Sequence, residues 1–298
     1  MASHGISEIV DEFIRYMQYE KKYSSHTVSA YKKDLEQFTL FLDSEYGKSA
    51  AGKVLADAAR DWVASLRMGG DKPRSVNRKI STLRSFSKFC QRQGLSVKIS
   101  RKLTSLKVDK NLPVFFKDSE IEAAIDSNDP GNDFVSVRDN LIIEILYQTG
   151  IRRSELISIK DEDFNFFSLT LRIWGKGSKE RLVPISGLLK NKVEGYIKLR
   201  NAMFGKTATL IVSDKGGPAY PNLVYRVVRK KMGEAGVQGK RSPHVVRHTF
   251  ATEMLNAGAE LDAVRSLLGH ANLAATQVYT HTTFERMKSV YKKAHPRK

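Results

Sequence analysis

Six residues in the second half of the chain have side chains that could together cut a phosphodiester bond. A tyrosine hydroxyl on a long, stiff side chain can attack phosphorus. Guanidinium groups stay charged at any working pH and can grip the non-bridging oxygens on which the transition state concentrates negative charge. A lysine near other cations has a lowered pKa, which suits it to protonate the departing 5′ oxygen. In chain order the six are Arg152, Lys176, His244, Arg247, His270 and Tyr279.

The spacing adds to the residue types. His244 and Arg247 are three residues apart in SPHVVRHTFAT, so on a helix both side chains project from one face and one phosphate could meet both. His244 could shuttle the tyrosine proton, because imidazole titrates near neutrality, while His270 would add a hydrogen bond to the phosphate. These two roles could be exchanged, and the sequence leaves the choice open.

Each residue alone also has an ordinary structural explanation. Tyrosines are common in cores, the segment GKGSK is typical of a turn with solvated lysines, and Gly150 could cap a helix that a surface helix follows. His244 and His248 are four apart, but no HExxH glutamate or Cys cluster completes a zinc site. GKGSK also lacks the Walker A pattern, so we expect neither a metal nor a nucleotide cofactor.

The occurrence of five short segments in one order is a stronger signal of function than any single residue. TGIRRSEL, GKGSKERLVPI, SPHVVRHTFAT, LLGHANLAATQ and VYTH together resemble the tyrosine recombinase (phage integrase) family, with the nearest likeness to Xer-type site-specific recombinases. The resemblance covers nearly the whole chain. It implies that Tyr279 is the nucleophile and forms a 3′-phosphotyrosyl link, with Lys176 as general acid and no need for metal or ATP.

Two adjacent arginines compete for one role. Neighbouring helical residues point about 100° apart, so only one of Arg152 and Arg153 can face the phosphate. The family's spacing within TGIRRSEL favours Arg152. Arg153 would then contact solvent or the DNA backbone.

Composition indicates a nucleic-acid partner. The chain has 298 residues, which predicts two domains, and a net charge of +18 with a pI near 9.8. The basic excess is spread over both domains, as a two-lobed clamp around a duplex requires, and binding should weaken steeply with salt. A single cysteine, Cys90, excludes an intramolecular disulfide and suggests a buried thiol. We expect a cytoplasmic protein with no membrane segment, since no signal or long apolar run is present.

The apolar pattern predicts a mainly α fold in two domains. Residues 1–106 read as a four-helix domain, with Ser25 as a cap for the second helix. The family resemblance implies that this is a core-binding (SAM-like) domain. A polar linker follows at 107–117. Residues 118–298 read as a mostly helical catalytic domain that begins with a capping box from Ser119 to Glu122. Alternation on both sides of GKGSK predicts a hairpin in a small antiparallel sheet, with Lys176 at its turn.

The fourth helix carries a basic stripe opposite its apolar face. A solvated surface is the ordinary explanation, but the resemblance favours a face that grips DNA, with any base readout in the major groove. Lysine and arginine side chains elsewhere would add backbone contacts. The predicted DNA-binding residues are Arg74, Arg78, Lys79, Lys88, Arg92, Arg153 and Lys179.

The tail after Tyr279 has an apolar edge that includes Phe284 and Tyr291. It could fold back on its own domain, or dock into a neighbouring subunit as a subunit-exchange helix, as in related recombinases. The resemblance implies a double-stranded DNA recombination site, a homo- or hetero-tetramer on two such sites and a Holliday junction intermediate, and it leaves open activation by a septal DNA translocase.

Other functions fit part of this pattern. An integrase of a mobile element and a type IB topoisomerase-like enzyme would use the same chemistry. The compact two-domain layout favours Xer-type chromosome-dimer resolution. A non-catalytic architectural DNA-binding protein is a different class, and it predicts loss of active-site residues, whereas all six are present.

Overall fold

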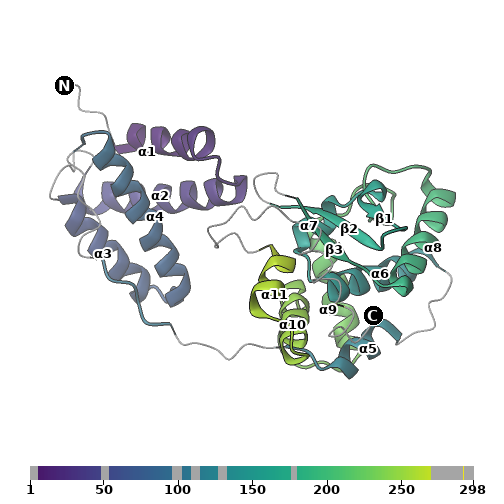
Figure 1. Cartoon of the computed structure of the whole chain (residues 1–298). Coiled ribbons are helices and arrows are strands. Elements are labelled where there is room, and N and C mark those ends of the chain that lie inside the picture. Colours follow the sequence, from purple (N-terminus) through teal and green to yellow (C-terminus); the bar gives the residue numbers. More distant parts are fainter. Residues whose placement is uncertain are drawn as a thin grey trace. The chain divides into compact units, whose positions relative to one another are not determined.

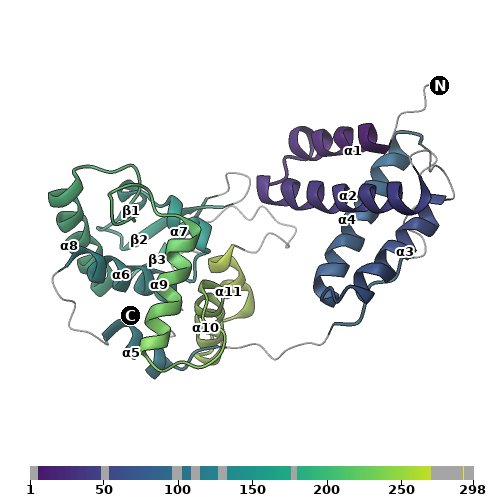
Figure 2. The same ribbon diagram turned by 180° about the vertical axis from the view of Figure 1, so that it is seen from behind.

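The chain forms two compact units, Met1–Asn111 and Leu112–Lys298. The structure is a computed structural model, and it describes residues 6–47, 54–95, 103–108, 115–126, 133–175, 180–269 and 291. Figures 1 and 2 show the two units from opposite sides. Both are built mainly from helices, and the second also holds a small antiparallel sheet, so the predicted fold class is confirmed.

The described part of the first unit packs four α-helices around an aromatic and aliphatic core. Phe38, Ile80 and Phe86 are almost completely buried in it, and so is the thiol of Cys90, whose pKa burial raises to about 12. The described elements are α1 (Ile6–Arg15), the π-helical turn η1 (Tyr16–Glu20), α2 (Ser25–Tyr46), α3 (Val54–Met68) and α4 (Pro73–Arg92).

The cap of α2 differs from the prediction by one residue. Ser24, not Ser25, precedes the helix, and its Oγ accepts a hydrogen bond from the backbone N–H of Thr27 at 3.3 Å. The sequence analysis also did not predict the π-helical turn that follows α1. Both differences lie at element ends, where local hydrogen bonds decide between adjacent residues.

The structure corrects part of the prediction that the basic residues of α4 face DNA. Arg74, Arg78, Lys88 and Arg92 are exposed. Lys79 is buried, because the helix turns it toward the core, where its Nζ donates to Asp71 at 2.8 Å and lies over the Trp62 ring. Its charge is therefore satisfied within the unit, and Lys79 does not belong to a surface that DNA could contact.

The second unit places a three-stranded sheet among helices. The strands lie in the order β1-β2-β3, all antiparallel, and Thr170 pairs with Pro184 while Trp174 pairs with Glu180. This confirms the predicted pairing of the two strands. Lys176, which was predicted at the turn, and Lys179 lie outside the described residues. The elements are α5 (Asp118–Asp126), α6 (Phe134–Thr149), α7 (Arg153–Ser158), η2 (Asp161–Asp163), β1 (Phe164–Asn165), β2 (Thr170–Trp174), β3 (Glu180–Pro184), α8 (Gly187–Phe204), α9 (Pro221–Glu234), α10 (Pro243–Asn256) and α11 (Leu261–Leu268).

Some local predictions for this unit were wrong or incomplete. The helix α5 begins at Asp118, and the carboxylate that reaches back is Glu120, which accepts from the backbone N–H of Lys117 at 2.8 Å. The predicted capping box from Ser119 to Glu122 is therefore not formed. Helix α8 and the short strand β1 were not predicted.

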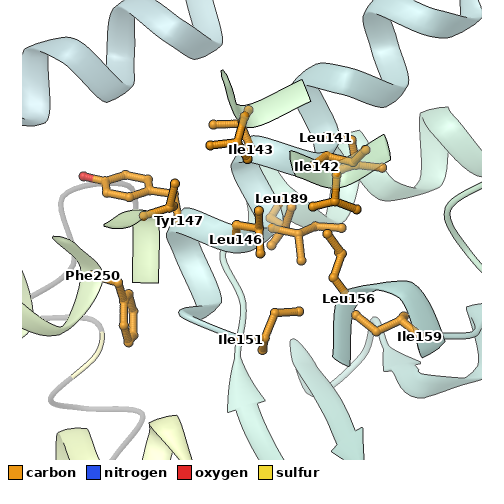
Figure 3. Packing of buried hydrophobic residues seen from close by; sticks show 14 of the residues in the cluster. Leu141, Ile142, Ile143, Leu146, Tyr147, Ile151, Leu156, Ile159, Leu189 and Phe250 are labelled. Carbon is orange, nitrogen blue, oxygen red and sulfur yellow. The ribbon is translucent and has the colours of Figure 1, made fainter. Parts of the chain in front are cut away.

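Helix α6 is the central element of this unit. It is buried on nearly all sides and contacts α5, α7, α8, α9 and α10. Figure 3 shows its side chains Leu141, Ile142, Leu146 and Tyr147 within the core. Asp133 caps its start by accepting from Ser136 N–H at 3.0 Å. Because nearly all of its surface is buried, α6 holds the start of the following segment in a fixed position.

A glycine ends α6 and turns the chain toward the site. Gly150 adopts a left-handed conformation, with φ of 59°, and a Cβ there would lie 2.3 Å from the Phe250 ring of α10. The ring of Phe250 is labelled in Figure 3. Only glycine combines this backbone conformation with such a close approach.

No helix in the described part of the chain is both long enough and apolar enough to cross a membrane.

We expect Gly150→Ala to destabilise the second unit strongly. The added methyl group meets Phe250 and the residue must hold a left-handed backbone, so the free energy of unfolding should fall by about 3 kcal/mol. The matched control is Gly258→Ala: φ there is +86°, but among the described residues no atom lies within 4 Å of the added Cβ, so backbone strain alone should cost about 1 kcal/mol. Urea unfolding followed by near-UV circular dichroism measures both. Equal losses in the two variants would show that the Phe250 contact does not set the geometry of this turn.

Candidate active site

The junction of α6 and α7 positions Arg152. Arg152 is the N-cap of α7, with extended backbone (φ −73°, ψ 151°), and its Nη1 donates to Glu155 Oε1 at 2.9 Å. Arg153 is the first helical residue, and its side chain is directed to the Pro221 carbonyl oxygen at 3.5 Å. The two arginines thus diverge as predicted. The reason differs from the predicted one, which treated both arginines as neighbouring residues of one helix. Arg152 is the N-cap and lies outside α7.

One buried carboxylate organises the charges. Glu155 is 5 % exposed and accepts four hydrogen bonds. Its Oε1 accepts from Arg152 Nη1 at 2.9 Å and from Arg181 Nη1 at 3.0 Å. Its Oε2 accepts from the Arg152 backbone N–H at 2.8 Å and from Arg181 Nη2 at 2.7 Å. All the acceptor positions of this carboxylate are therefore used, as a buried charge requires.

The electrostatics of Glu155 follow from these bonds. Burial by itself would raise the pKa of this carboxyl, but hydrogen bonds and charge from Arg181 and then from Arg152 outweigh it, so the pKa of Glu155 lies below its usual value. The carboxylate is ionised at neutral pH. Its negative charge holds the buried guanidinium of Arg181 next to the partly exposed guanidinium of Arg152.

Three arginine side chains donate hydrogen bonds to consecutive carbonyl oxygens at the C-terminal end of α11. Arg181 Nε donates to the Leu267 carbonyl at 2.7 Å, Arg247 Nη2 to the Leu268 carbonyl at 2.6 Å, and Arg152 Nη2 to the Gly269 carbonyl at 2.9 Å. These carbonyls come at the end of the helix, where intrahelical donors run out and the helix dipole is negative. We call Arg152, Arg181 and Arg247 the arginine clamp.

Helix α10 supplies His244 and Arg247, one turn apart. Arg247 Nη1 donates to the Gly150 carbonyl at 2.6 Å, which ties α10 to the end of α6. Burial, together with the charge of Arg152, lowers the pKa of Arg247 to about 10. Burial also lowers the pKa of His244, and the positive charges of Arg153 and Arg247 lower it further. His244 is therefore mainly neutral at pH 7, and a neutral imidazole can accept a proton.

The structure brings together three of the six predicted residues. Arg152, His244 and Arg247 lie within electrostatic range of one another in the second unit. Lys176, His270 and Tyr279 lie outside the described residues. Residues that follow or precede them in the sequence do contribute to the site: the carbonyl of Gly269, next to His270, accepts from Arg152, and Arg181 comes five residues after Lys176.

The sequence analysis missed two residues of the site, Glu155 and Arg181. A signal existed for each of them. Glu155 is the third residue of α7, where a carboxylate commonly reaches back to the N-cap N–H. Arg181 occupies the buried side of the alternating strand β3, together with Val183. A charged residue at an inward position predicts a buried partner of opposite charge.

One residue of the tail is described. Tyr291 is helical and 2 % exposed in the core of the second unit, with its hydroxyl 3.4 Å from Gln148 Oε1 of α6. At this residue the tail packs against its own domain. The rest of the predicted subunit-exchange helix lies outside the described residues.

Among the described residues, no group of three or more His, Cys, Asp or Glu side chains is arranged to hold a metal ion. The charged groups of the site are instead three guanidinium groups and the carboxylate of Glu155.

Comparison with known proteins agrees with this fold. Residues 115–286 match the model of the phage integrase family, and residues 10–94 match the phage integrase N-terminal SAM-like domain. The chain therefore belongs to the phage integrase family, and it is a site-specific tyrosine recombinase, an enzyme that breaks and rejoins DNA.

Individual relatives cover nearly the full length. The chain is 38 % identical to the tyrosine recombinase XerC of Staphylococcus saprophyticus over 98 % of both chains, and 38 % identical to that of Anoxybacillus flavithermus over 96 % of both. Among solved structures, the XerH recombinase in a post-cleavage complex with palindromic difH superposes with a TM-score of 0.68 at 22 % identity, covering 94 % of this chain and 83 % of the other. That structure supports the fold alone.

The charge of Glu155 gives a pH-dependent contribution to stability. Because its folded pKa is depressed, the contribution is present above the unfolded value of about 4.5 and is lost as the pH falls through the folded pKa. At pH 7, Glu155→Gln leaves the buried guanidinium of Arg181 and the partly exposed one of Arg152 without their counter-ion and should cost about 3 kcal/mol. The difference from wild type should shrink as the pH falls below 4.5, in urea unfolding at a series of pH values.

The matched control is Glu162→Gln, because the Glu162 side chain is 70 % exposed. It should differ little from wild type at any pH. A Glu155→Gln deficit that stays constant from pH 7 to below pH 4 would contradict an ionised Glu155 in the folded protein.

Proposed function

We propose that the arginine clamp, with His244, is the phosphate-binding part of the recombination site. The observation that carries this proposal is the charge imbalance: three guanidinium groups share one buried carboxylate, so a monoanionic phosphate would relieve the repulsion that lowers the pKa of Arg247. Arg152 and Arg247 would donate to the non-bridging oxygens, because their side chains are partly exposed, whereas Arg181 is buried.

The chemical steps follow from these groups. The hydroxyl oxygen of Tyr279 attacks the scissile phosphorus, and its proton passes to His244, which is neutral because burial and nearby cations lower its pKa. The bond from phosphorus to the 5′ oxygen breaks, and Lys176 protonates that oxygen. His270 adds a hydrogen bond to the phosphate. The energy of the broken bond is kept in the 3′-phosphotyrosyl link, and the 5′ hydroxyl of the partner duplex then attacks it to rejoin the strands.

We infer a Xer-type role for the recombinase. Support comes from relatives named XerC that are 38 % identical over nearly the whole chain. The substrate would be a chromosomal recombination site in the cytoplasm, resolved by four protomers on two sites through a Holliday junction. The proposal leaves two possibilities for the other protomers of the tetramer: they are identical to this chain, or they are a paralogous recombinase. It also includes activation by a septal DNA translocase.

Further DNA contacts would come from the basic side chains of both units. In the first unit these are the exposed residues of α4, Arg74, Arg78, Lys88 and Arg92. Arg78 forms an ion pair with the buried Asp34, and Arg92 donates to the Tyr16 hydroxyl at 2.9 Å, so both are held in fixed positions. In the second unit, Arg153 and Lys179 are the proposed backbone contacts. Such contacts position the protein without reading sequence.

We expect covalent capture of nicked DNA by the wild-type protein. A suicide substrate that carries the presumptive chromosomal resolution site, incubated in EDTA, should give a protein–DNA band on a denaturing gel. Tyr279→Phe should abolish the band, and Arg152→Ala should reduce its rate by about 100-fold or more, in the range measured for loss of one transition-state donor. Arg153→Ala is the matched control and should change cleavage only a few-fold.

Full cleavage by Arg152→Ala together with loss in Arg153→Ala would overturn the role of Arg152. A band that persists in Tyr279→Phe would overturn the nucleophile. Absence of any band from wild-type protein that binds the site specifically would contradict the proposed reaction for this DNA.

A further inference from the structure

Arg181 is a buried cation of the site to which the proposed reaction gives no role. It lies near the start of β3 and is 5 % exposed, so it does not offer its guanidinium to solvent. Burying a charge is costly unless it is fully paired. The three bonds described above meet this cost: two to the carboxylate of Glu155 and one to the carbonyl of Leu267.

The geometry of Arg181 is rigidly fixed. Its two Nη atoms bind the two oxygens of one carboxylate side by side, an arrangement that sets both position and plane. The end of α11 packs closely against the guanidinium of Arg181, because a Cβ on Gly269 would lie 2.9 Å from Arg181 Nη1. The φ angle of Gly269 is +67°, in the left-handed region. Arg181 therefore joins three elements, β3, α7 and the end of α11.

The consequence for Arg152 is electrostatic as well as steric. Glu155 sits between two guanidiniums, and Arg181 takes one hydrogen bond on each carboxylate oxygen. If Arg181 were absent, the full charge of Glu155 would face Arg152. Arg152 would then be neutralised within the protein and drawn toward the carboxylate, and its charge would be less available to an incoming phosphate.

We propose that Arg181 is a positioning residue for strand cleavage, which acts on the scissile phosphate through Glu155 and Arg152 and does not touch DNA. The proposal rests on the proposed function, in which Arg152 grips that phosphate. Arg181 balances the charge of Glu155 and fixes its plane, so that Arg152 keeps its orientation and its net attraction for the phosphate.

A second route by which Arg181 could act has to be separated from the first. Arg181 follows Lys176 by five residues in the sequence, so a change at Arg181 could disturb the proposed general acid instead. The two routes differ in the chemistry they affect. Loss of Arg152 weakens charge stabilisation at the non-bridging oxygens, whereas loss of Lys176 slows protonation of the 5′ oxygen.

The test compares Arg181→Met with wild type on three nicked DNAs of the same sequence. One has an ordinary scissile phosphate, one a methylphosphonate, in which a neutral methyl replaces a non-bridging oxygen, and one a 5′-bridging sulfur. The sulfur leaves as a thiolate that needs no proton. Single-turnover rates of covalent complex formation are measured for each, and Arg152→Ala and Lys176→Ala serve as references for the two routes.

On the ordinary phosphate we expect Arg181→Met to cleave about 100-fold more slowly than wild type, the scale of a small misplacement of a catalytic group. On the methylphosphonate the deficit should shrink to a few-fold, as for Arg152→Ala, because less negative charge has to be stabilised. On the bridging-sulfur substrate the deficit should persist. Arg181→Lys, which keeps the charge but not the two-pronged geometry, should fall between wild type and Arg181→Met with the same pattern.

Arg172→Met is the matched control, because Arg172 lies on the neighbouring strand β2 and pairs with Asp163 instead of Glu155. It should cleave all three DNAs like wild type. Urea unfolding and gel-shift binding confirm that the Met variants are folded and bind DNA. If Arg181→Met does not fold, the substrate pattern of Arg181→Lys decides.

Two results would overturn the role of Arg181: a deficit that is the same on the methylphosphonate as on the phosphate, or one that disappears on the bridging-sulfur substrate, which would place the effect on Lys176. Wild-type protein that cleaves none of the DNAs would instead count against the proposed function. In that case hydrogen exchange still tests the contact itself: Arg181→Met should speed exchange in the backbone of 265–269, and unchanged exchange would contradict it.

Discussion

The four hydrogen bonds on the Glu155 carboxylate are the interaction on which the candidate site depends. Like charges repel, so guanidinium groups gathered for a phosphate need a counter-ion while no phosphate is bound. Glu155 supplies one negative charge for three guanidiniums. The site therefore contains its own counter-ion and still retains an excess of positive charge. A second carboxylate in the same place would improve the charge balance of the free protein and weaken its attraction for the substrate.

The second requirement is a rigid frame, and α6 and α11 provide it. Helix α6 is buried all round and ends at Gly150, whose carbonyl oxygen holds Arg247 and whose left-handed turn sends the chain to Arg152. The last carbonyls of α11 hold the arginine clamp from the other side. Helix ends usually satisfy such carbonyls with water or a capping glycine. Here these carbonyl groups accept hydrogen bonds from three arginine side chains. The end of the helix therefore orients the charged groups of the site.

Much of this could be predicted from the sequence, and the reasons are local. The helices of the first unit follow from apolar residues such as Phe38 and Phe86 at helical spacing, and the β2–β3 hairpin follows from alternation on both sides of a glycine-rich turn. Arg152, His244 and Arg247 were predicted as site residues because their residue types and segments match a known chemistry, and the structure places them near one another.

Other features depend on contacts between distant parts of the chain. Alternation along β3 places Arg181 on the buried side of the strand, but it does not identify the partner: Glu155 lies 26 residues away and meets Arg181 only when β3 packs beside α7 and α11. Lys79 was predicted to be a DNA-binding residue; its burial against Asp71 and Trp62 depends on how α3 and α4 pack. Arg152 as an N-cap, instead of a helical residue, depends on where Gly150 ends α6.

The most direct test of the central claim is a structure of the protein on its DNA site with orthovanadate, which mimics the five-coordinate phosphorus of the transition state. The account predicts that Arg152 and Arg247 donate to the equatorial vanadate oxygens, that Tyr279 and the 5′ oxygen occupy the axial positions, and that Arg181 stays on Glu155 without contacting DNA. A vanadate held by Arg153, or by Arg181 after release of Glu155, would contradict it.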